Sequence, residues 1–291
     1  MVYNSGQIEM KKYLIVLSTL VLFAFSSCTK IMLSGNNVTK EFSIEGSYTE
    51  LCVENAFDVT VSDAVSQITV TTDENVMPKV RVEKKGEKVR IYLKPLTVNA
   101  GMDLKVILPD NGELKHVELS GASKFHSSYG LMNKKIEVNL SGASDFYCDV
   151  FADEIGIEMS GASNFFGEMS ADEIDMNLSG ASKIKSTLVA YELDLDMSGA
   201  SDATLEGGVD KLDIDLSGAS SIIKQVVGGC YAFACGQCEG TMSGSSEAYI
   251  HCDGNIKVEL SGGSELHFTG NGNPADSSTS SGSDIIHDVN P

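Results

Sequence analysis

The chain has 291 residues and is strongly acidic, because 41 Asp and Glu residues oppose 21 Lys and Arg and give a net charge of −20 at pH 7. A surface of this sign repels phosphate groups, so we expect neither nucleic acid nor anionic lipid headgroups as partners. Tryptophan is absent from the sequence, which removes the preferred platform for stacking on sugars. Composition therefore excludes a nucleic-acid-binding protein but does not define a fold.

A secretion signal is predicted near the N-terminus. Met10 and two lysines form a charged segment, and the apolar run 13–25 has the length of a signal-peptide core. Two serines and Cys28 follow and resemble a bacterial lipobox. We expect residues 1–27 to be a signal peptide, with Met10 as an alternative start, and Cys28 to carry the lipid. The alternatives are an ordinary signal peptide cut near Ser27 or a retained anchor, although the run is short for a spanning helix.

A polar tether and a β-rich segment come next. Residues 28–40 are predicted to tether the body to its lipid. Residues 41–114 contain short alternating apolar and polar segments such as 57–61 and 88–93. We expect irregular N-terminal coils and an end cap, because a bare terminal coil exposes both core and strand edges. Residues 41–291 are interpreted as one domain.

Residues 115–270 repeat one phrase, Ser-Gly-Ala-Ser, relaxed to Ser-Gly-Ser-Ser and Ser-Gly-Gly-Ser at the end. The copies begin at Ser120, Ser141, Ser160, Ser179, Ser198, Ser217, Ser243 and Ser261, so successive steps are 21, 19, 19, 19, 19, 26 and 18 residues. A fixed period of this length indicates one structural unit stacked many times.

The residues around each phrase define that unit. Apolar side chains stand one, three and five positions before most copies with polar residues between them, and this period of two is typical of a strand with one buried face. The phrase itself favours a bend, because Gly tolerates positive φ and Ser bonds nearby backbone. A second apolar column follows the phrase: Phe125, Phe146, Phe165, Ile184, Ala203, Ile222, Ala248 and Leu266. The pattern predicts an all-β fold, a single parallel β-helix (β-solenoid) of about 19-residue coils, with residues 271–291 as a degenerate last coil.

These residues resemble a known family. The segment Val53–Val59, the Ser-Gly-small-Ser bends and Gly-Asn-Pro at 272–274 are similar to the head GIN domain of auto-transporter adhesins, a family of lipoproteins in Bacteroidota. The resemblance covers about residues 40–290. It implies a β-helical body similar in outline to pectin-lyase folds and an adhesive role, and it brings no set of catalytic residues. The family's usual bend is closer to Gly-Ser-Gly-Asp-Val, so the phrase here is a variant.

Part of the negative charge lies at fixed positions of the repeat. The repeat places five aspartates on one outer face: Asp175, Asp194, Asp196, Asp213 and Asp215. Carboxylates stacked one coil apart repel unless they are solvated, screened or bridged by cations. A weak Ca²⁺ site is one interpretation, since Ca²⁺ prefers oxygen ligands. The favoured alternative is a solvated acidic face that keeps the β-stack soluble.

The cysteines at 230, 235 and 238 have the spacing of a plant-type iron–sulfur loop. They lie in the 26-residue step, which we interpret as an insertion. An exported protein forms disulfides more readily than clusters. We therefore expect either a local disulfide among Cys230, Cys235 and Cys238 or free buried thiols.

A stripe of aromatic residues stands six positions after the first Ser of the phrase. Tyr147, Phe166 and Tyr249 share this register with His126 and His267. If exposed, the stripe could bind a glycan or peptide. Partial burial at a coil corner is the favoured alternative.

Two classes of function follow. The first is a non-enzymatic, lipid-anchored module of the cell envelope that presents its side faces to an unknown glycan, matrix or envelope protein. The alternative is a carbohydrate-active enzyme, a polysaccharide lyase or hydrolase, which fold analogy permits. We favour the module, without a cofactor, because no unique polar constellation converges in the repeats. We expect an outer-membrane lipoprotein that touches the membrane through its anchor only, on the periplasmic face or the cell surface.

Overall fold

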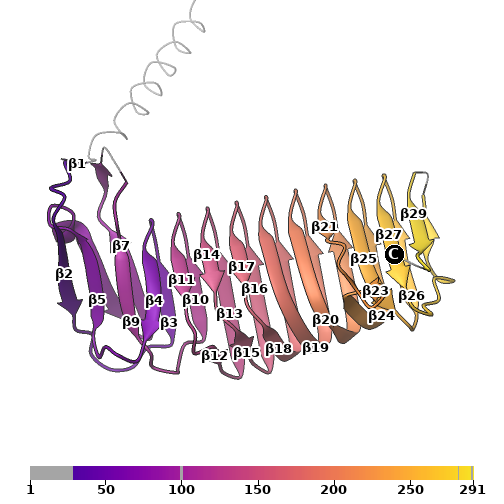
Figure 1. Cartoon of the computed structure of the whole chain (residues 1–291), viewed down its shortest axis with the longest axis horizontal. Coiled ribbons are helices and arrows are strands. Elements are labelled where there is room, and N and C mark those ends of the chain that lie inside the picture. Colours follow the sequence, from indigo (N-terminus) through magenta and orange to yellow (C-terminus); the bar gives the residue numbers. More distant parts are fainter. Residues whose placement is uncertain (1–28, 99–100, 281, 290) are drawn as a thin grey trace, which may run out of the picture.

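The protein is a rod of stacked β-coils, seen from the side in Figure 1. The computed structural model describes residues 29–98, 101–280, 282–289 and 291. The predicted signal peptide and Cys28 lie outside the described residues. Apart from the 3₁₀ turn η1 (Met77–Lys79), the described elements are strands. The predicted all-β parallel solenoid with coils of about 19 residues is confirmed, since consecutive coils pair in parallel at that offset.

Each regular coil contributes strands to three parallel ladders. The first ladder precedes the bends and contains β10 (His116–Leu119), β13 (Lys135–Leu140), β16 (Glu154–Met159), β26 (Ile256–Leu260), β28 (Ser278–Thr279) and the C-terminal parts of β18 (Met169–Leu178), β19 (Lys183–Met197), β20 (Asp202–Leu216) and β24 (Phe233–Met242).

The second ladder follows the bends. It contains β11 (Lys124–His126), β14 (Asp145–Tyr147), β17 (Asn164–Phe166), β21 (Ser221–Ile222), β25 (Glu247–Cys252), β27 (Glu265–Thr269), β29 (Asp284–His287) and the starts of β19 and β20. The third, shorter ladder contains β12 (Leu131–Met132), β15 (Val150–Phe151), the starts of β18 and β24 and the middle parts of β19 and β20.

The N-terminal strands cap the rod. β3 (Glu50–Val53) and β7 (Lys88–Leu93) extend the first ladder, and β4 (Asp58–Ser62) and β9 (Lys105–Pro109) extend the second. Antiparallel pairing then begins, with β5 (Ile68–Asp73) on β9, β2 (Asn37–Phe42) on β5, and β6 (Val80–Lys85) on β7. The outermost strands carry many charged and polar residues, which discourages further edge pairing.

Part of the segment predicted to be a tether is strand. β1 (Thr29–Ile31) pairs with β8 (Leu96–Val98), and β2 begins at Asn37. The hydroxyls of Thr39 and Thr71 lie 2.8 Å apart across β2 and β5. Sequence reasoning missed β2 because most of its side chains are exposed or half-buried, so it shows little apolar alternation.

The bends stack through their glycines. Gly161 has a φ of +74°, a left-handed conformation that other residues rarely adopt. The amide N–H of Ala162 donates to the carbonyl oxygen of Gly142 in the preceding coil at 2.7 Å. A Cβ on Gly161 would lie only 2.4 Å from that oxygen. Glycine is therefore required both for the turn and for the close approach of the next coil.

The row of left-handed residues, here called the bend spine, begins at Asn55. This residue has a φ of +78°, and its carbonyl accepts the N–H of Ala122 at 2.6 Å. Its side-chain Oδ1 accepts the N–H of Leu93 at 2.8 Å, which helps to hold the conformation that Asn tolerates better than most residues. The spine continues through Gly121, Gly142, Gly161, Gly180, Gly199, Gly218, Gly244, Gly262 and Gly282.

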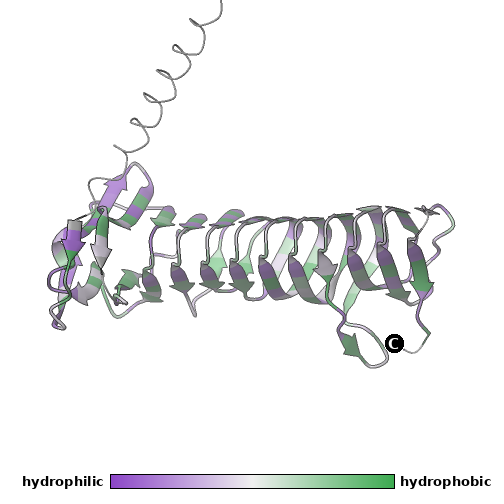
Figure 2. Ribbon diagram, turned by 90° about the horizontal axis from the view of Figure 1, so that it is seen from above, coloured by the Kyte–Doolittle hydropathy of each residue, from purple (hydrophilic) through white to green (hydrophobic). Residues whose placement is uncertain are grey.

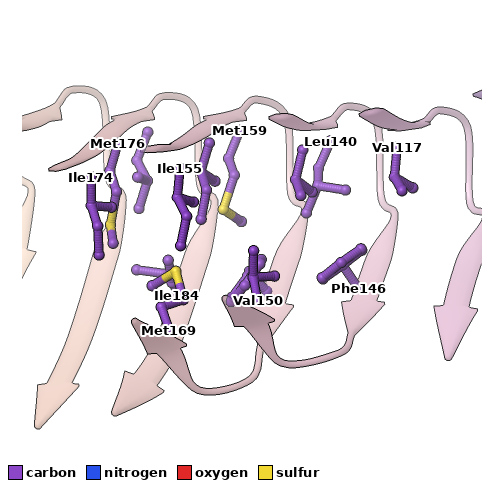
Figure 3. Close-up of a cluster of buried hydrophobic side chains, with 14 of the residues drawn as sticks. Val117, Leu140, Phe146, Val150, Ile155, Met159, Met169, Ile174, Met176 and Ile184 are labelled. Carbon is purple, nitrogen blue, oxygen red and sulfur yellow. The ribbon is translucent and has the colours of Figure 1, made fainter. Parts of the chain in front are cut away.

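The core lies between the ladders, where the predicted inward columns are buried (Figure 3). Phe125, Phe146 and Phe165 stack with ring centroids 5.2 and 5.1 Å apart. The second Ser of each phrase is also buried, and Ser144 Oγ donates to the carbonyl of Ser141 at 2.9 Å. Figure 2 shows the resulting alternation of hydrophilic and hydrophobic bands along the strands.

The bend spine predicts that Gly161→Ala is strongly destabilising. A left-handed alanine costs about 1–2 kcal/mol by itself, and the collision with Gly142 adds to this cost. Gly86→Ala is the matched control, because Gly86 has a φ of +63° but nothing within 4 Å of its virtual Cβ. Urea denaturation should show the larger loss for Gly161→Ala, and equal losses would contradict the role of close approach.

Candidate functional site

The first ladder presents the predicted acidic residues outward. Asp175, Asp194 and Asp213 pair in register across three coils, and Asp196 pairs with Asp215 in the neighbouring column. All five are exposed. The structure therefore brings together the set that the repeat predicted, and we name these five residues the acidic face.

Partial burial and neighbouring negative charges raise the pKa of Asp194, Asp196 and Asp213. Partial burial, followed by the charge of Asp215, raises the pKa of Asp196. Partial burial and then the charges of Glu239 and Asp194 raise the pKa of Asp213. Nearby lysines offset some of this repulsion on the same ladder, as in the Lys211–Glu192 pair at 3.6 Å. Exposed pairs of this kind contribute only about 0–1 kcal/mol.

The oxygens of the acidic face form a row along the rod. Among the described residues, the His, Cys, Asp and Glu group whose ligand atoms lie within 4.8 Å of one another is Glu247, Glu265 and His267. The aspartates of the acidic face are outside that group. Their arrangement is suited to a diffuse layer of hydrated cations.

A polar groove of about 650 Å³ runs beside the bends. Its walls repeat from coil to coil, with a carboxylate or amide two residues before each bend and the first Ser of the phrase. The lining polar residues are Glu118, Asn139, Ser141, Glu158, Ser160, Asn177, Ser179, Asp196, Ser198, Asp215 and Ser217. The groove therefore offers the same kinds of hydrogen-bonding groups in successive coils, which suits an extended polymer with many hydroxyl or amide groups.

The aromatic stripe forms two stacks on the second ladder. His126, Tyr147 and Phe166 stack with centroids 4.6 and 4.9 Å apart. Tyr249 stacks on His267 at 4.6 Å, and Lys185 and Thr204 separate the two stacks in register. The rings cover one another's faces and are half-buried, so most of the surface that would stack on a sugar is occupied.

The insertion holds cysteines but no disulfide. Cys230, Cys235 and Cys238 are free thiols, so the local disulfide considered from the sequence is absent from the described residues. Cys235 and Cys238 point into the core and are buried, whereas Cys230 lies in a hairpin outside the coil. Contact with the thiol of Cys235 and then burial raise the pKa of Cys252, which makes its thiol unreactive.

The same insertion builds a polar cluster that sequence reasoning missed. The hairpin of β22 (Val226–Val227) and β23 (Cys230–Tyr231) leaves the rod near its C-terminal end (Figure 2). The hydroxyl of Tyr231 donates to Asp288, whose Oδ2 lies 2.9 Å from Nδ1 of His267. The 26-residue step signalled the insertion, but it gave no indication of what the hairpin packs against.

Within 29–98, 101–280, 282–289 and 291, no helix has the length and apolar character needed to cross a bilayer.

The acidic face predicts that Asp213→Asn stabilises the protein at pH 7 and low salt. Because the pKa of Asp213 is raised, its ionised form opposes folding, and this cost disappears as pH falls through the raised pKa. We expect a gain of about 0.2–1 kcal/mol, smaller in 1 M salt, where screening acts over about 3 Å. Urea denaturation over pH and salt measures this gain.

The control is Asp202→Asn in the same strand, because Asp202 pairs with Lys183 at 2.8 Å and should show no gain. Equal gains in both variants would contradict the repulsion argument. A Ca²⁺-specific stabilisation that Asp213→Asn abolishes would instead establish the cation site.

No curated protein matches the sequence significantly. A putative adhesin from Parabacteroides distasonis has a similar structure, with a TM-score of 0.61 at 19% identity over 89% of this chain and 97% of the other. One from Parabacteroides merdae has a TM-score of 0.56 at 17% identity, with coverage of 89% and 97%. A third, called a putative lipid binding protein, from P. distasonis, has a TM-score of 0.61 at 19% identity, with coverage of 89% and 99%.

At these identities the solved structures show a shared fold only. The sequence profile described as "Putative auto-transporter adhesin, head GIN domain" matches residues 47–187 and 166–272. These two matches together cover most of the chain, including the N-terminal strands from β3 onward and the eight copies of the bend phrase. The protein therefore belongs to the head GIN domain family of auto-transporter adhesins.

Proposed function

We propose that the protein is a non-enzymatic, lipid-anchored module of the cell envelope that binds an extended glycan, matrix or envelope-protein partner along its side faces. The observation that carries the proposal is the polar groove beside the bends, whose walls repeat from coil to coil. The adhesin description of the family agrees with this role.

The groove supports binding of a polymer rather than a small molecule. Asn139, Glu158 and Asn177 occupy the same register position in successive coils, and parallel β-strands stack at about 4.8 Å. Each contact with solvent-exposed polar groups is weak, but linked contacts along one chain act together and increase the overall affinity. The affinity of the groove for a polymer therefore increases with the number of coils that the polymer covers.

The alternative, a carbohydrate-active enzyme, needs a general acid and a base or nucleophile at one defined point. The outward carboxylates of this rod recur from coil to coil, as Asp175, Asp194 and Asp213 do. Repetition spreads similar groups over the acidic face and gives no single coil of that face a distinct chemical environment. This favours the binding module over the enzyme.

The anchor is proposed to be lipid on Cys28, in the outer membrane. This arrangement leaves two orientations, toward the periplasm or toward the outside of the cell. An adhesin must face outward, so orientation tests the function directly.

Antibody labelling of intact cells provides that test. A tag after Pro291 should be labelled on unpermeabilised cells as strongly as in a lysate, and a tagged periplasmic protein should be labelled only after lysis. Cys28→Ser should move the protein from the membrane fraction to the soluble fraction. Labelling of the wild-type chain only after lysis would contradict an adhesin and indicate a periplasmic partner.

A further inference from the structure

The C-terminal end of the second ladder brings two glutamates and a histidine together. Glu247 of β25 pairs with Glu265 of β27, and Tyr249 pairs with His267 two residues later. One carboxylate oxygen from each glutamate and an imidazole nitrogen of His267 lie within 4.8 Å of one another. A single ion placed among them could contact all three.

Asp288 orients the imidazole. Nδ1 of His267 lies 2.9 Å from Oδ2 of Asp288, and Nε2 lies 3.3 Å from Glu265 Oε2 and 4.0 Å from Glu247 Oε1. When Nδ1–H donates to Asp288, the lone pair of neutral Nε2 faces two carboxylates. Nε2 of His267 and the two glutamate oxygens are then three acceptors close together, and they repel one another unless a cation or a proton lies between them. A carboxylate behind the far nitrogen is also the usual second partner of a metal-binding histidine.

The surrounding contacts hold these groups in place. The hydroxyl of Tyr231 donates to Asp288, and that of Tyr249 donates to Glu247. The ring of His267 stacks on Tyr249, and its side chain is only 15% exposed. The hairpin that carries Tyr231 therefore positions His267 through Asp288.

His126, the other histidine of the stripe, has a similar ring stack but fewer carboxylate neighbours than His267. His126 stacks on Tyr147 at 4.6 Å, as His267 stacks on Tyr249. Its Nε2 lies 3.4 Å from one carboxylate, that of Asp58, while the neighbouring Asp145 is bound by Lys124 at 2.6 Å. His126 therefore provides an internal comparison with similar packing but an incomplete ligand set.

We propose that Glu247, Glu265 and His267 bind one first-row divalent metal ion, with Zn²⁺ as the representative case. One imidazole nitrogen and two carboxylate oxygens suit Zn²⁺ and related ions. Both glutamates are partly exposed, so water or a partner's donor atom completes the coordination. The two carboxylates repel each other when no ion is bound, and each is attracted to the bound ion. The ion thereby links β25 to β27 beside the hairpin.

Calorimetric titration of Zn²⁺ into the full-length protein tests the proposal. We expect one equivalent to bind, loss of that binding in His267→Asn, and an affinity about 10–100-fold lower in Asp288→Asn. His126→Asn is the matched control and should bind as the wild type does. Co²⁺ as a second probe should give a spectrum of nitrogen and oxygen ligands without a thiolate charge-transfer band, which separates this site from the cysteines.

Three results would overturn the proposal. These are the absence of Zn²⁺ binding at millimolar concentration, unchanged binding in His267→Asn, and a thiolate signature with Co²⁺. Absence of binding would leave the cluster as hydrogen bonds and close contacts between His267 and the three carboxylates. Because Asp288→Asn could release the hairpin, Glu265→Gln serves as a second variant. Its melting temperature in a chelator should match the wild type, while its Zn²⁺ affinity falls at least tenfold. The test is independent of the proposed binding role of the groove.

Discussion

The close approach of neighbouring coils at each bend is the constraint on which the rest of the structure depends. A left-handed glycine turns the chain there, and its carbonyl accepts an N–H from the next coil at 2.6–2.7 Å through the Ser-Gly-Ala-Ser bends. A side chain at that position would collide with the preceding backbone. The bend therefore fixes where each coil lies relative to the previous one. The strands before and after the bend pair with the preceding coil in the register that the bend sets.

This register determines both the core and the outer faces. Inward side chains stack on like side chains, as Phe125, Phe146 and Phe165 do. Outward side chains stack as well, so one or two aspartates from each of three coils form the acidic face. One carboxylate or amide per coil lines the groove. The repeat that stabilises the rod thus also builds an extended polar surface, which is the basis for the proposed binding role.

The repeat period in the sequence was enough to predict the buried columns and the residues that lie beside one another in adjacent coils. Alternation before each phrase correctly gave the buried columns, and counting positions placed Asp194 beside Asp213 and His267 beside Tyr249. The period carries no information on lateral packing. Ring stacking, the free state of the cysteines and the docking of Tyr231 on Asp288 depend on distances between elements that no spacing encodes. β2 was missed for a related reason, because an edge strand buries little and shows weak alternation.

Deletion of one complete coil tests the central claim that the coils are equivalent stacked units. Removing residues 160–178 joins Met159 to Ser179 and preserves the order of strand and bend. Equivalent coils should give a folded rod about 4.8 Å shorter, with unchanged β-sheet circular dichroism and a cooperative urea transition at somewhat lower stability. Removing residues 160–169 breaks the period and should prevent folding. Loss of folding after the full-coil deletion, or equal tolerance of both deletions, would show that the coils are not equivalent stacked units.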